Sequence, residues 1–382
     1  MHVAQISFFL DPLQRTHADI LRDWWPLVDA AEMAVEAGAR VSVIQACSEN
    51  QELTQRGVSY YFMRPDEGVT RLGASSRFAR RLADLRPDVL HVHGLSFGAD
   101  VLDLARLAPG VPIYIQDHAS RLPPWWRRVA MRRGLRPASA ISFCSIEQSE
   151  PFVRAGMIAA HTRVVEMPET STRFVPGDAA LARQATGVSG APAVLTVGHL
   201  DENKDPLTVL EGISATVERL PGLQLWCCYG KGPLEPRVRE RITSDPLLAG
   251  RVHLLGRVPH ARIEQMMRAA DLFVQGSHRE GSGCALVEAL ACGLPPVVTD
   301  IPSFRTLTAN GRIGELWPCA DAPRLSRALL SVAAQPGLRP VVRAHFESEL
   351  SFAAVGRKLT HLYENLQLAA DTRTGAVAEL RK

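Results

Sequence analysis

Short apolar runs alternate with longer amphipathic segments through the first half of the chain. An apolar run bounded by polar or glycine residues is typical of a buried strand, and an amphipathic segment is typical of a helix that covers a sheet. The pattern predicts strands over residues 3–9, 40–45, 89–92, 113–116 and 140–144. It predicts helices over residues 24–37, 76–85 and 98–107.

The alternation begins again after an irregular stretch over residues 168–190. New strands are predicted over residues 193–197, 224–228, 252–254, 272–275 and 296–299, and helices over residues 206–220 and 262–269. Strands that alternate with helices form parallel sheets covered by helices. We therefore expect an α/β protein of two Rossmann-like, doubly wound parallel-sheet domains that face a central cleft. Ligands of such sheets lie at the carboxyl ends of the strands.

The segment from Glu280 to Glu288 carries the clearest chemical signal. A predicted strand over 272–275 runs into a glycine-rich turn, and a short helix is predicted to begin at Cys284. Amides at a helix start attract phosphate, and two carboxylates can bind two different sets of hydroxyls. These features predict a sugar-nucleotide site. The structural alternative is an ordinary strand–turn–helix unit, with Glu280 as an acid favoured by the helix dipole and Glu288 as a partly buried carboxylate.

Two further loops of the second domain follow predicted strands. Lys204 lies in the loop after residues 193–197, where a lysine can neutralise a diphosphate. Gly230 and Gly232 follow the strand over 224–228. Lys204 alone is better explained as a solvated surface lysine, but three loops at the strand ends of one sheet favour a shared ligand.

Composition limits the classes of function. The chain has 382 residues, of which 46% are hydrophobic and 22% charged, and this is enough for two packed domains. The net charge of +3 gives no support for nucleic-acid binding. The seven cysteines lie mostly in apolar runs, as expected of buried, reduced thiols in a cytosolic protein. The N-terminal residues fit a core strand better than a signal peptide, and no apolar run is long enough to span a bilayer.

The order of motifs resembles glycosyltransferase family 4, the retaining enzymes of GT-B fold. The motifs are Gly-x-Leu with Asn-Lys at 198–204, Gly-x-Gly-Pro-Leu at 230–234, Leu-Gly-x-Val at 255–258, Ala-Asp-Leu-Phe-Val at 270–274 and Glu-x7-Glu-Ala-x-Ala-Cys-Gly-x-Pro at 280–295. In the first domain, residues 86–94 are similar to the family's strand that leads to the acceptor cleft. The resemblance covers nearly the whole chain.

The resemblance assigns the domains of a GT-B protein. Residues 1–170 would form the acceptor-side domain, and residues 171–348 would form the donor domain, which binds the nucleotide sugar. Residues 349–370 look like the terminal helix that crosses back to the N-terminal domain. The polar residues 371–382 are expected to be a disordered tail.

The resemblance also implies the catalytic residues. Lys204 would neutralise the donor diphosphate, Glu280 would bind hydroxyls of the transferred sugar, and His118 would face that sugar from the other domain. Glu288 would bind the ribose. The other expected donor-binding residues are Gly198, His199, Arg257, Val258, Gly281, Ser282, Gly283 and Cys284. The expected acceptor-side residues are Asp11, Arg15 and His93.

Two positions depart from the family's pattern. His199 stands where the family usually has arginine, so a permanent positive charge is replaced by a group that is only partly charged near neutral pH. Residues 9–15 replace the family's Gly-Gly loop after the first strand. Arg15 is a candidate substitute for the lost amides of that loop, and an ordinary surface arginine is the alternative.

The implied mechanism depends on the charge of the leaving group. A nucleoside diphosphate gains negative charge as the glycosidic bond breaks, so Lys204 and the helix start would stabilise the transition state more than the ground state. Such a leaving group needs no general acid, and the two glutamates would recognise hydroxyls rather than act as the acid and base of a hydrolase. The sequence contains no Asp-x-Asp pair, which favours a metal-independent, cofactor-independent reaction.

Two other clusters have competing interpretations. His91 and His93 lie on one face of a predicted strand and suit zinc, although the sequence offers no obvious third ligand. Residues 121–136 combine Trp125 and Trp126 with six arginines, and residues 118–146 contain no acid. This composition suits peripheral contact with an anionic membrane, whereas the alternative is a solvated basic helix whose tryptophans pack inward.

The leading hypothesis is a cytoplasmic glycosyltransferase that moves a sugar from a nucleoside-diphosphate donor to a hydroxyl of a glycan, a lipid-linked sugar or a small molecule. Expected partners are the nucleotide sugar, that acceptor and, through residues 121–136, the inner face of a membrane; no nucleic acid and no metal are expected. The alternatives are a sugar-nucleotide epimerase of the same architecture and a GT-B binding or scaffold protein that has lost catalysis.

Overall fold

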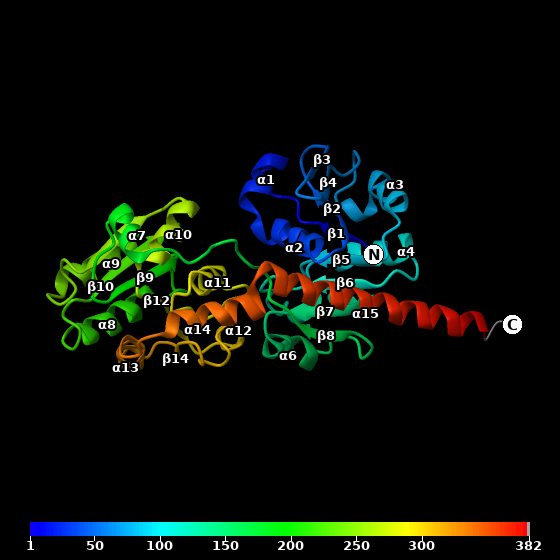
Figure 1. The fold of residues 1–382 in the computed structure, drawn as a ribbon. Helices are drawn as coiled ribbons and strands as arrows, with labels where there is room; N and C mark the ends of the chain where they lie inside the picture. The colour runs from blue at the N-terminus through cyan, green and yellow to red at the C-terminus, as the bar shows by residue number, and fades with distance from the viewer. Residues whose placement is uncertain (380–382) are drawn as a thin grey trace. The chain divides into compact units, whose positions relative to one another are not determined.

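The computed structural model describes residues 1–379, except for the side chains of residues 25, 26 and 373–379. The chain divides into two units, each with its own sheet (Figure 1). The first unit comprises Met1–Thr170 and the C-terminal segment from Phe352, and the second comprises Ser171–Ser351. Both sheets are covered by helices, so the α/β architecture of two doubly wound domains is confirmed.

Within the described residues, the first unit has an eight-stranded sheet of order β3-β4-β2-β1-β5-β6-β7-β8. Only the β3–β4 pair is antiparallel. The strand order changes direction between β1 and β5, and such a switch point opens a crevice at the carboxyl ends of the strands. The strands are β1 (His2–Ser7), β2 (Arg40–Ala46), β3 (Gln51–Gln55), β4 (Val58–Met63), β5 (Val89–His93), β6 (Ile113–Gln116), β7 (Ala138–Phe143) and β8 (Arg163–Glu166).

Alternate residues of these strands pack on opposite faces of the sheet. Val3 of β1 belongs to a core that includes helices α2 and α15, whereas Ala4 belongs to a second core with α3 and α4. This division follows from the two-residue period of a strand. The helices of the first unit are α1 (His17–Asp23), α2 (Trp25–Glu36), α3 (Ser76–Leu85), α4 (Gly98–Leu107), α5 (Trp125–Leu135), α6 (Ile146–Arg154) and α15 (Phe352–Glu379), with a 3₁₀ turn at Leu72–Ala74.

Helix α15 returns the C-terminal segment to the first unit. Its residues Val355, Leu359 and Tyr363 are fully buried in the core that contains α2, and Figure 1 shows the red helix beside α2. The Tyr363 hydroxyl hydrogen-bonds Nδ1 of His91 at 2.8 Å. The helix continues to Glu379 through most of the expected disordered tail, and residues 371–379 contain no proline that would end it. Residues 380–382 of that expected tail lie outside the described residues.

The second unit has, in the described chain, a six-stranded parallel sheet of order β11-β10-β9-β12-β13-β14. Its switch point lies between β9 and β12. The strands are β9 (Ala193–Gly198), β10 (Gln224–Tyr229), β11 (Val252–Gly256), β12 (Leu272–Gln275), β13 (Pro296–Thr299) and β14 (Glu315–Trp317). The helices are α7 (Ala179–Thr186), α8 (Pro206–Val217), α9 (Glu235–Ser244), α10 (His260–Ala269), α11 (Cys284–Ala291), α12 (Pro302–Leu307), α13 (Ala322–Ala333) and α14 (Leu338–His345), followed by a π-helical turn at Phe346–Leu350.

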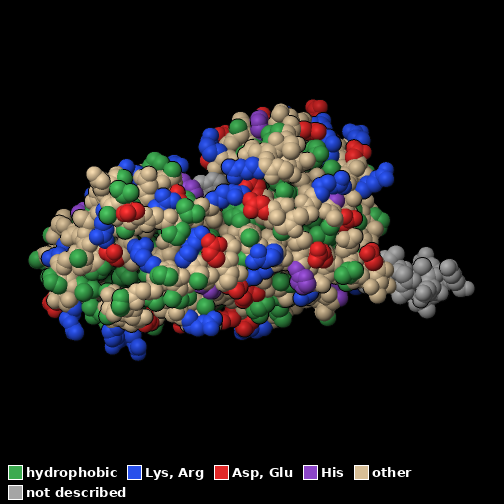
Figure 2. Space-filling view, viewed as in Figure 1, with side chains coloured by type: hydrophobic (Ala, Val, Ile, Leu, Met, Phe, Trp, Pro, Cys, Tyr) green, Lys and Arg blue, Asp and Glu red, His purple; other side chains and the backbone are tan. Residues whose placement is uncertain are grey.

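Surface properties follow the composition. Basic and acidic side chains are interspersed on the face seen in Figure 2, in keeping with the small net charge. No helix in residues 1–379 combines the length and the apolar character that crossing a membrane requires.

All seven cysteines are free thiols, and five are buried. Cys284 is exposed because it is the first residue of α11, so the expectation of a buried thiol is wrong at this position.

The position of α5 depends on a close approach to α4 at two glycines. A Cβ added to Gly134 would lie 2.4 Å from Cα of Gly98, a separation that no side chain tolerates. Gly134 and Leu135 are the buried residues of α5, whereas most of its other residues are exposed or half-exposed. The two glycines therefore let the backbones pack directly against each other.

We expect Gly134→Ala to destabilise the first unit by about 1–3 kcal/mol, because the added methyl group overpacks a backbone contact and this outweighs the gain in helix propensity. Urea unfolding followed by circular dichroism measures the change. The matched control is Arg133→Ala, a substitution at an exposed neighbour that should stay within about 0.5 kcal/mol of the parent. Equal stability of the two variants would show that α4 and α5 can separate without cost.

Candidate functional site

The switch point of the second unit brings together the two residues expected to bind the diphosphate and the sugar. Lys204 lies in the loop between β9 and α8, and Glu280 lies in the loop between β12 and α11. Because β9 and β12 are parallel neighbours, both loops leave the same edge of the sheet. Nζ of Lys204 donates to Oε1 of Glu280, and both side chains are mostly buried, at 19% and 14% exposure.

Hydrogen bonds between the two loops hold this ion pair in place. Nδ2 of Asn203 donates to the carbonyl of Arg279 at 3.0 Å, and the amide of His278 donates to the carbonyl of Asn203 at 2.8 Å. Nε2 of His278 lies 3.1 Å from Oδ2 of Asp205. Sequence reasoning missed these positioning contacts, since they join residues that are more than 70 positions apart. The loops therefore form one unit around Lys204 and Glu280.

A small cavity of about 30 Å³ lies beside Lys204 and is also lined by Gly198, His199 and Gln275. Gln275 is the last residue of β12 and is 3% exposed. Within the described chain, its Oε1 atom is buried without a hydrogen-bond partner. A buried acceptor of this kind is costly unless a ligand or water donates to it. Gln275 is therefore a further candidate for hydroxyl recognition, and its place in an apolar strand gave no sequence signal.

The hydrogen bonding of His199 determines what it can offer a ligand. The backbone amide of Lys231 donates to Nδ1 of His199 at 3.2 Å, so this nitrogen acts as an acceptor. A neutral imidazole with an acceptor at Nδ1 carries its proton on Nε2. His199 is therefore arranged as a neutral Nε2–H donor, and it does not reproduce the permanent charge of an arginine.

The glycine-rich turn is shaped by Gly283, the N-cap residue of α11. Its φ of 58° lies in the left-handed region, and a Cβ there would meet Leu307 at 2.9 Å. Gly281 and Ser282 precede it in the same turn, and Cys284 begins the helix as expected. The first-turn amides of α11 thus face the loop that contains Glu280, which is the arrangement that attracts an anion.

Glu288 already has a partner. It is 8% exposed, and its Oε1 lies 2.6 Å from Nε2 of His260, the first residue of α10. The His260 ring also packs against Phe174, with ring centroids 4.7 Å apart. His260 lies two residues after Val258, so the carboxylate expected to bind ribose is linked to the loop expected to border the base. Sequence reasoning missed His260.

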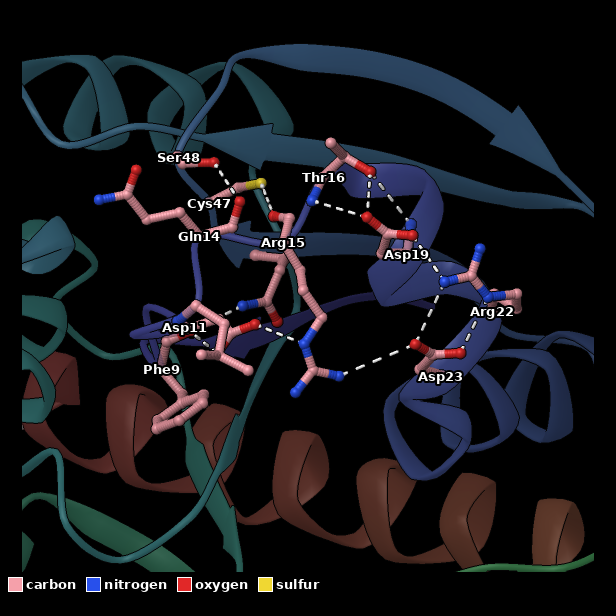
Figure 3. A network of polar contacts seen from close by, with 12 residues as sticks. Phe9, Asp11, Gln14, Arg15, Thr16, Asp19, Arg22, Asp23, Cys47 and Ser48 are labelled. Atoms are coloured by element: carbon pink, nitrogen blue, oxygen red, sulfur yellow. Dashed lines mark hydrogen bonds and ion pairs between the residues drawn. The ribbon is translucent and has the colours of Figure 1, made fainter. Parts of the chain in front are cut away.

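In the first unit, Asp11 and Arg15 form one polar network after β1 (Figure 3). Nε of Arg15 lies 2.7 Å from Oδ2 of Asp11, and its Nη1 lies 3.9 Å from Oδ2 of Asp23. Oδ1 of Asp11 accepts from the amide of Leu13 at 3.1 Å. The charge of Arg15 is thus balanced by two carboxylates, which weakens the hypothesis that Arg15 replaces a lost phosphate cradle.

A cavity of about 830 Å³ opens beside this network, in the first unit. Its walls come from segments that follow β1, β2 and β4, and they include Gln14, Asn50, Arg64 and Arg77. The amide of Arg64 donates to Oδ1 of Asn50 at 2.9 Å, which joins two of these segments. Arg64 was missed because β3 and β4, the strands before it, were not predicted, and Arg77 was predicted only as part of the helix over residues 76–85.

His93 and His118 lie together at the carboxyl ends of β5 and β6. Nδ1 of His93 is 3.1 Å from Nε2 of His118, and Nδ1 of His118 donates to Glu169, a residue that sequence reasoning also missed. His91 is buried and bonded to Tyr363 and Gln116, and burial lowers its pKa to about 3. No group of three or more potential metal-binding side chains occurs among the described residues.

Helix α5 presents its tryptophans to solvent. Trp125, Trp126 and Val129 are 74%, 63% and 74% exposed, and the two indole rings meet edge to face. The alternative in which these tryptophans pack inward is therefore wrong, because only the glycine-containing end of α5 is buried.

Two doubly wound sheets, with a phosphate-attracting helix start and a lysine–glutamate pair at one switch point, define an α/β protein of the GT-B class. The family profile described as "Glycosyl transferases group 1" matches residues 179–344, and the profile described as "Glycosyl transferase 4-like domain" matches residues 27–168. The chain belongs to glycosyltransferase family 4 and is a glycosyltransferase.

Individual comparisons agree with this assignment. The chain is 28% identical over 357 residues to the "Phosphatidyl-myo-inositol mannosyltransferase" of Mycolicibacterium smegmatis, a match that covers 89% of each chain. Its fold is similar to that of a sucrose-phosphate synthase from Thermosynechococcus elongatus, with a TM-score of 0.68, 20% identity and coverage of 96% and 99%. It is also similar to the fold of Anabaena Alr3699/HepE, solved in complex with UDP, with a TM-score of 0.70, 18% identity and coverage of 96% and 100%.

Substitutions of Lys204 and Glu280 should change the free energy of unfolding non-additively. In a double-mutant cycle of Lys204→Met and Glu280→Gln, urea unfolding should give a coupling free energy of about 0.5–3 kcal/mol, because each single change leaves a mostly buried group without its partner. The control cycle uses Arg239 and Glu235 of α9, a more exposed pair whose coupling should not exceed about 0.5 kcal/mol. Strict additivity at Lys204 and Glu280 would contradict the ion pair.

Proposed function

We propose that this glycosyltransferase moves a sugar from a nucleoside-diphosphate donor to an acceptor hydroxyl, with retention of anomeric configuration and without a metal ion. The observation that carries the proposal is the Lys204–Glu280 pair at the switch point of the second unit, beside the start of α11. A cation and an acceptor of hydroxyl hydrogen bonds, placed side by side at an anion-attracting helix start, suit a ligand that has a diphosphate next to a sugar.

Three groups would stabilise the departing diphosphate. Lys204 supplies a positive charge, His199 supplies an Nε2–H donor, and the first-turn amides of α11 supply the positive end of a helix dipole. Charge builds up on the leaving phosphate as the glycosidic bond breaks, so these groups bind the transition state more strongly than the ground state. The diphosphate is thus stabilised by protein groups alone, and the proposed reaction proceeds without metal.

The carboxylates would recognise hydroxyls. Glu280, bonded to Lys204 in the structure, would also accept hydrogen bonds from hydroxyls of the transferred sugar. Glu288, held by His260, would accept hydrogen bonds from the ribose. The acceptor oxygen would attack the anomeric carbon from the side of the leaving group as the bond to the phosphate oxygen breaks. Attack from that side gives retention. The acceptor proton passes to the phosphate oxygen, and the nucleoside diphosphate leaves as the second product.

The acceptor would bind in the first unit. Its cavity of about 830 Å³ is lined by polar side chains, and its two arginines, Arg64 and Arg77, are balanced by Asp66 and Glu67, so it suits a polyhydroxylated group. The mannosyltransferase relative is named for phosphatidyl-myo-inositol, which has a headgroup of this chemistry. An acceptor attached to a lipid requires the protein to reach a membrane surface.

We assign this contact to the exposed face of α5. Trp125, Trp126 and Val129 form an apolar patch beside exposed arginines of the same helix, and residues 118–146 contain no acid. Tryptophan is favoured at the headgroup level of a bilayer, and each arginine near an anionic surface contributes about 1 kcal/mol of attraction. The proposed partner of this face is an anionic membrane surface.

Lys204→Ala and Glu280→Ala should each lower kcat/KM for sugar transfer by at least about 100-fold, because each removes a group that contacts the donor. The measurement is release of nucleoside diphosphate, with anomeric configuration read by NMR and with EDTA present in a parallel assay. Lys358→Ala in α15 is the matched control and should retain parental activity.

Donor binding is tested separately by thermal unfolding with UDP, GDP and ADP. A nucleotide at 100 times its dissociation constant should stabilise the protein by about 2.7 kcal/mol, and Lys204→Ala should reduce this shift. Epimerisation of the nucleotide sugar in the absence of acceptor would replace the transferase proposal with the epimerase alternative. Absence of binding and of turnover with every nucleotide sugar would favour the scaffold alternative. Activity lost in EDTA and restored by a divalent cation would overturn metal independence.

The Trp125→Ala, Trp126→Ala double variant should bind vesicles containing anionic lipid at least about tenfold more weakly than the parent, because two exposed indoles no longer enter the interface. Co-sedimentation measures this, and raising the salt concentration should weaken the parent's binding through its arginines. Leu181→Ala is the control, since Leu181 is a 65% exposed apolar residue of the second unit. Equal binding by the double variant and the parent would exclude α5 as the membrane surface.

A further inference from the structure

A row of polar side chains, buried except for the half-buried His118, runs through the first unit and ends at Glu169. It joins Gln5 of β1, His93 of β5 and His118, which follows β6, to Glu169, which follows β8. The exposures of Gln5, His93 and Glu169 are 0%, 6% and 7%. Because solvent has little access to Gln5, His93 and Glu169, the hydrogen bonds within the row determine where the protons lie.

The side-chain amide of Gln5 determines which ring nitrogen of His93 carries the proton. Its Nε2 donates to the carbonyl of Ala30 at 3.2 Å, so its Oε1 faces Nε2 of His93, at 3.4 Å. A carbonyl oxygen can only accept, and Nε2 of His93 must therefore carry a hydrogen. Burial, aided by the neighbouring imidazoles of His91 and His118, lowers the pKa of His93 well below its ordinary value. His93 is thus neutral, with its proton on Nε2 and a lone pair on Nδ1.

The positions of the ring protons of His118 follow from this assignment of His93. The lone pair of His93 Nδ1 faces Nε2 of His118 at 3.1 Å, so His118 must donate from Nε2. At its other nitrogen, Nδ1 of His118 faces Oε1 of Glu169, which is an acceptor when the carboxylate is ionised. Both ring nitrogens of His118 are then donors, and an imidazole with two N–H groups is an imidazolium cation.

The neighbouring histidine, His91, has one hydrogen-bond acceptor and one hydrogen-bond donor as its partners. Nε2 of His91 faces Oε1 of Gln116 at 3.1 Å, and the amide nitrogen of Gln116 donates to the carbonyl of Glu169 at 3.4 Å. His91 Nδ1 is left to accept from the hydroxyl of Tyr363. His91 is therefore neutral, and of these three adjacent histidines only His118 carries charge.

We propose that Glu169 is a positioning residue that holds His118 as an imidazolium, so that the first unit presents a positive charge to an anionic group of a substrate at the carboxyl ends of β5 and β6. This inference rests on the proposed function for the role of the charge, but not for its existence. His199 of the second unit is arranged, in contrast, as a neutral donor.

The groups around His118 agree with this assignment. It faces the carboxylates of Glu169 and Asp117 and the rings of His91 and His93. Burial opposes the charge of His118, but the hydrogen bond and charge of Glu169, aided by Asp117, outweigh burial and raise its pKa. Asp117 accepts from the amide of Ser120 at 3.0 Å, whereas Glu169 is the carboxylate bonded to the His118 ring. The imidazolium is present below the raised pKa and is lost as pH rises through it.

The direct test is ¹⁵N NMR of histidine-labelled protein, with His118→Asn to assign the resonances. In the parent at pH 7, both ring nitrogens of His118 should show the shifts of protonated nitrogens. In Glu169→Gln, which keeps a hydrogen-bond acceptor but removes the charge, the titration midpoint should fall by about 1–2 pH units. Glu166→Gln, an exposed glutamate of β8, is the matched control and should leave the midpoint unchanged. A neutral His118 at pH 7 in the parent, or an unchanged midpoint in Glu169→Gln, would overturn the proposal.

Turnover gives the second readout. With a donor that the parent transfers, Glu169→Gln should move the alkaline limb of the kcat–pH profile to lower pH and reduce kcat at pH 8 by about 10–100-fold, with the acceptor KM nearly unchanged. An alkaline limb that stays in place despite a shifted NMR midpoint would show that catalysis does not use the charge. If the protein transfers no sugar, the proposed function fails while the NMR result still decides the protonation of His118.

Discussion

The parallel pairing of β9 with β12 is the constraint on which the candidate donor site depends. Leu195 and Phe273 lie opposite each other in this pair, so the loops that follow the two strands leave the sheet side by side. Lys204 and Glu280 come together across 76 residues of sequence for this reason. The contacts of Asn203 with the 278–279 backbone then hold the loops as a single surface. Without the switch point between β9 and β12, the lysine, the glutamate and the start of α11 would not share an edge.

His199 and His118 have different roles, which their hydrogen bonds assign. His199 accepts a backbone amide at Nδ1 and is thereby arranged as a neutral donor. His118 faces an acceptor at each ring nitrogen, which requires the charged form. The same side chain thus serves as a dipole in one unit and as a cation in the other, because partners within hydrogen-bond distance, and not the residue type, decide where protons lie.

Apolar periodicity predicted the strands and helices that are buried on a continuous face. The bounds of β6, β12, β13, α3 and α4 agree with their predicted ranges, and α11 begins at the predicted residue, because uninterrupted apolar or amphipathic runs leave few alternatives. The hairpin of β3 and β4 was missed because β3 is a short, mostly exposed edge strand of polar residues, and β14 was missed because it has only three residues. Missing the hairpin also hid Arg64 and the cavity beside it.

The sequence by itself determined the α/β class, the two units and the residue types at the strand ends, because these depend on local periodicity and on motifs within a few residues of one another. Only the tertiary structure decided the partners: Glu169 for His118, His260 for Glu288, Asp23 for Arg15 and solvent for Trp125. Each partner is set by strand order or by packing between elements distant in sequence, and local patterns contain no information on either. Protonation follows the same rule, since a proton's position depends on the acceptor that the fold brings within hydrogen-bond distance.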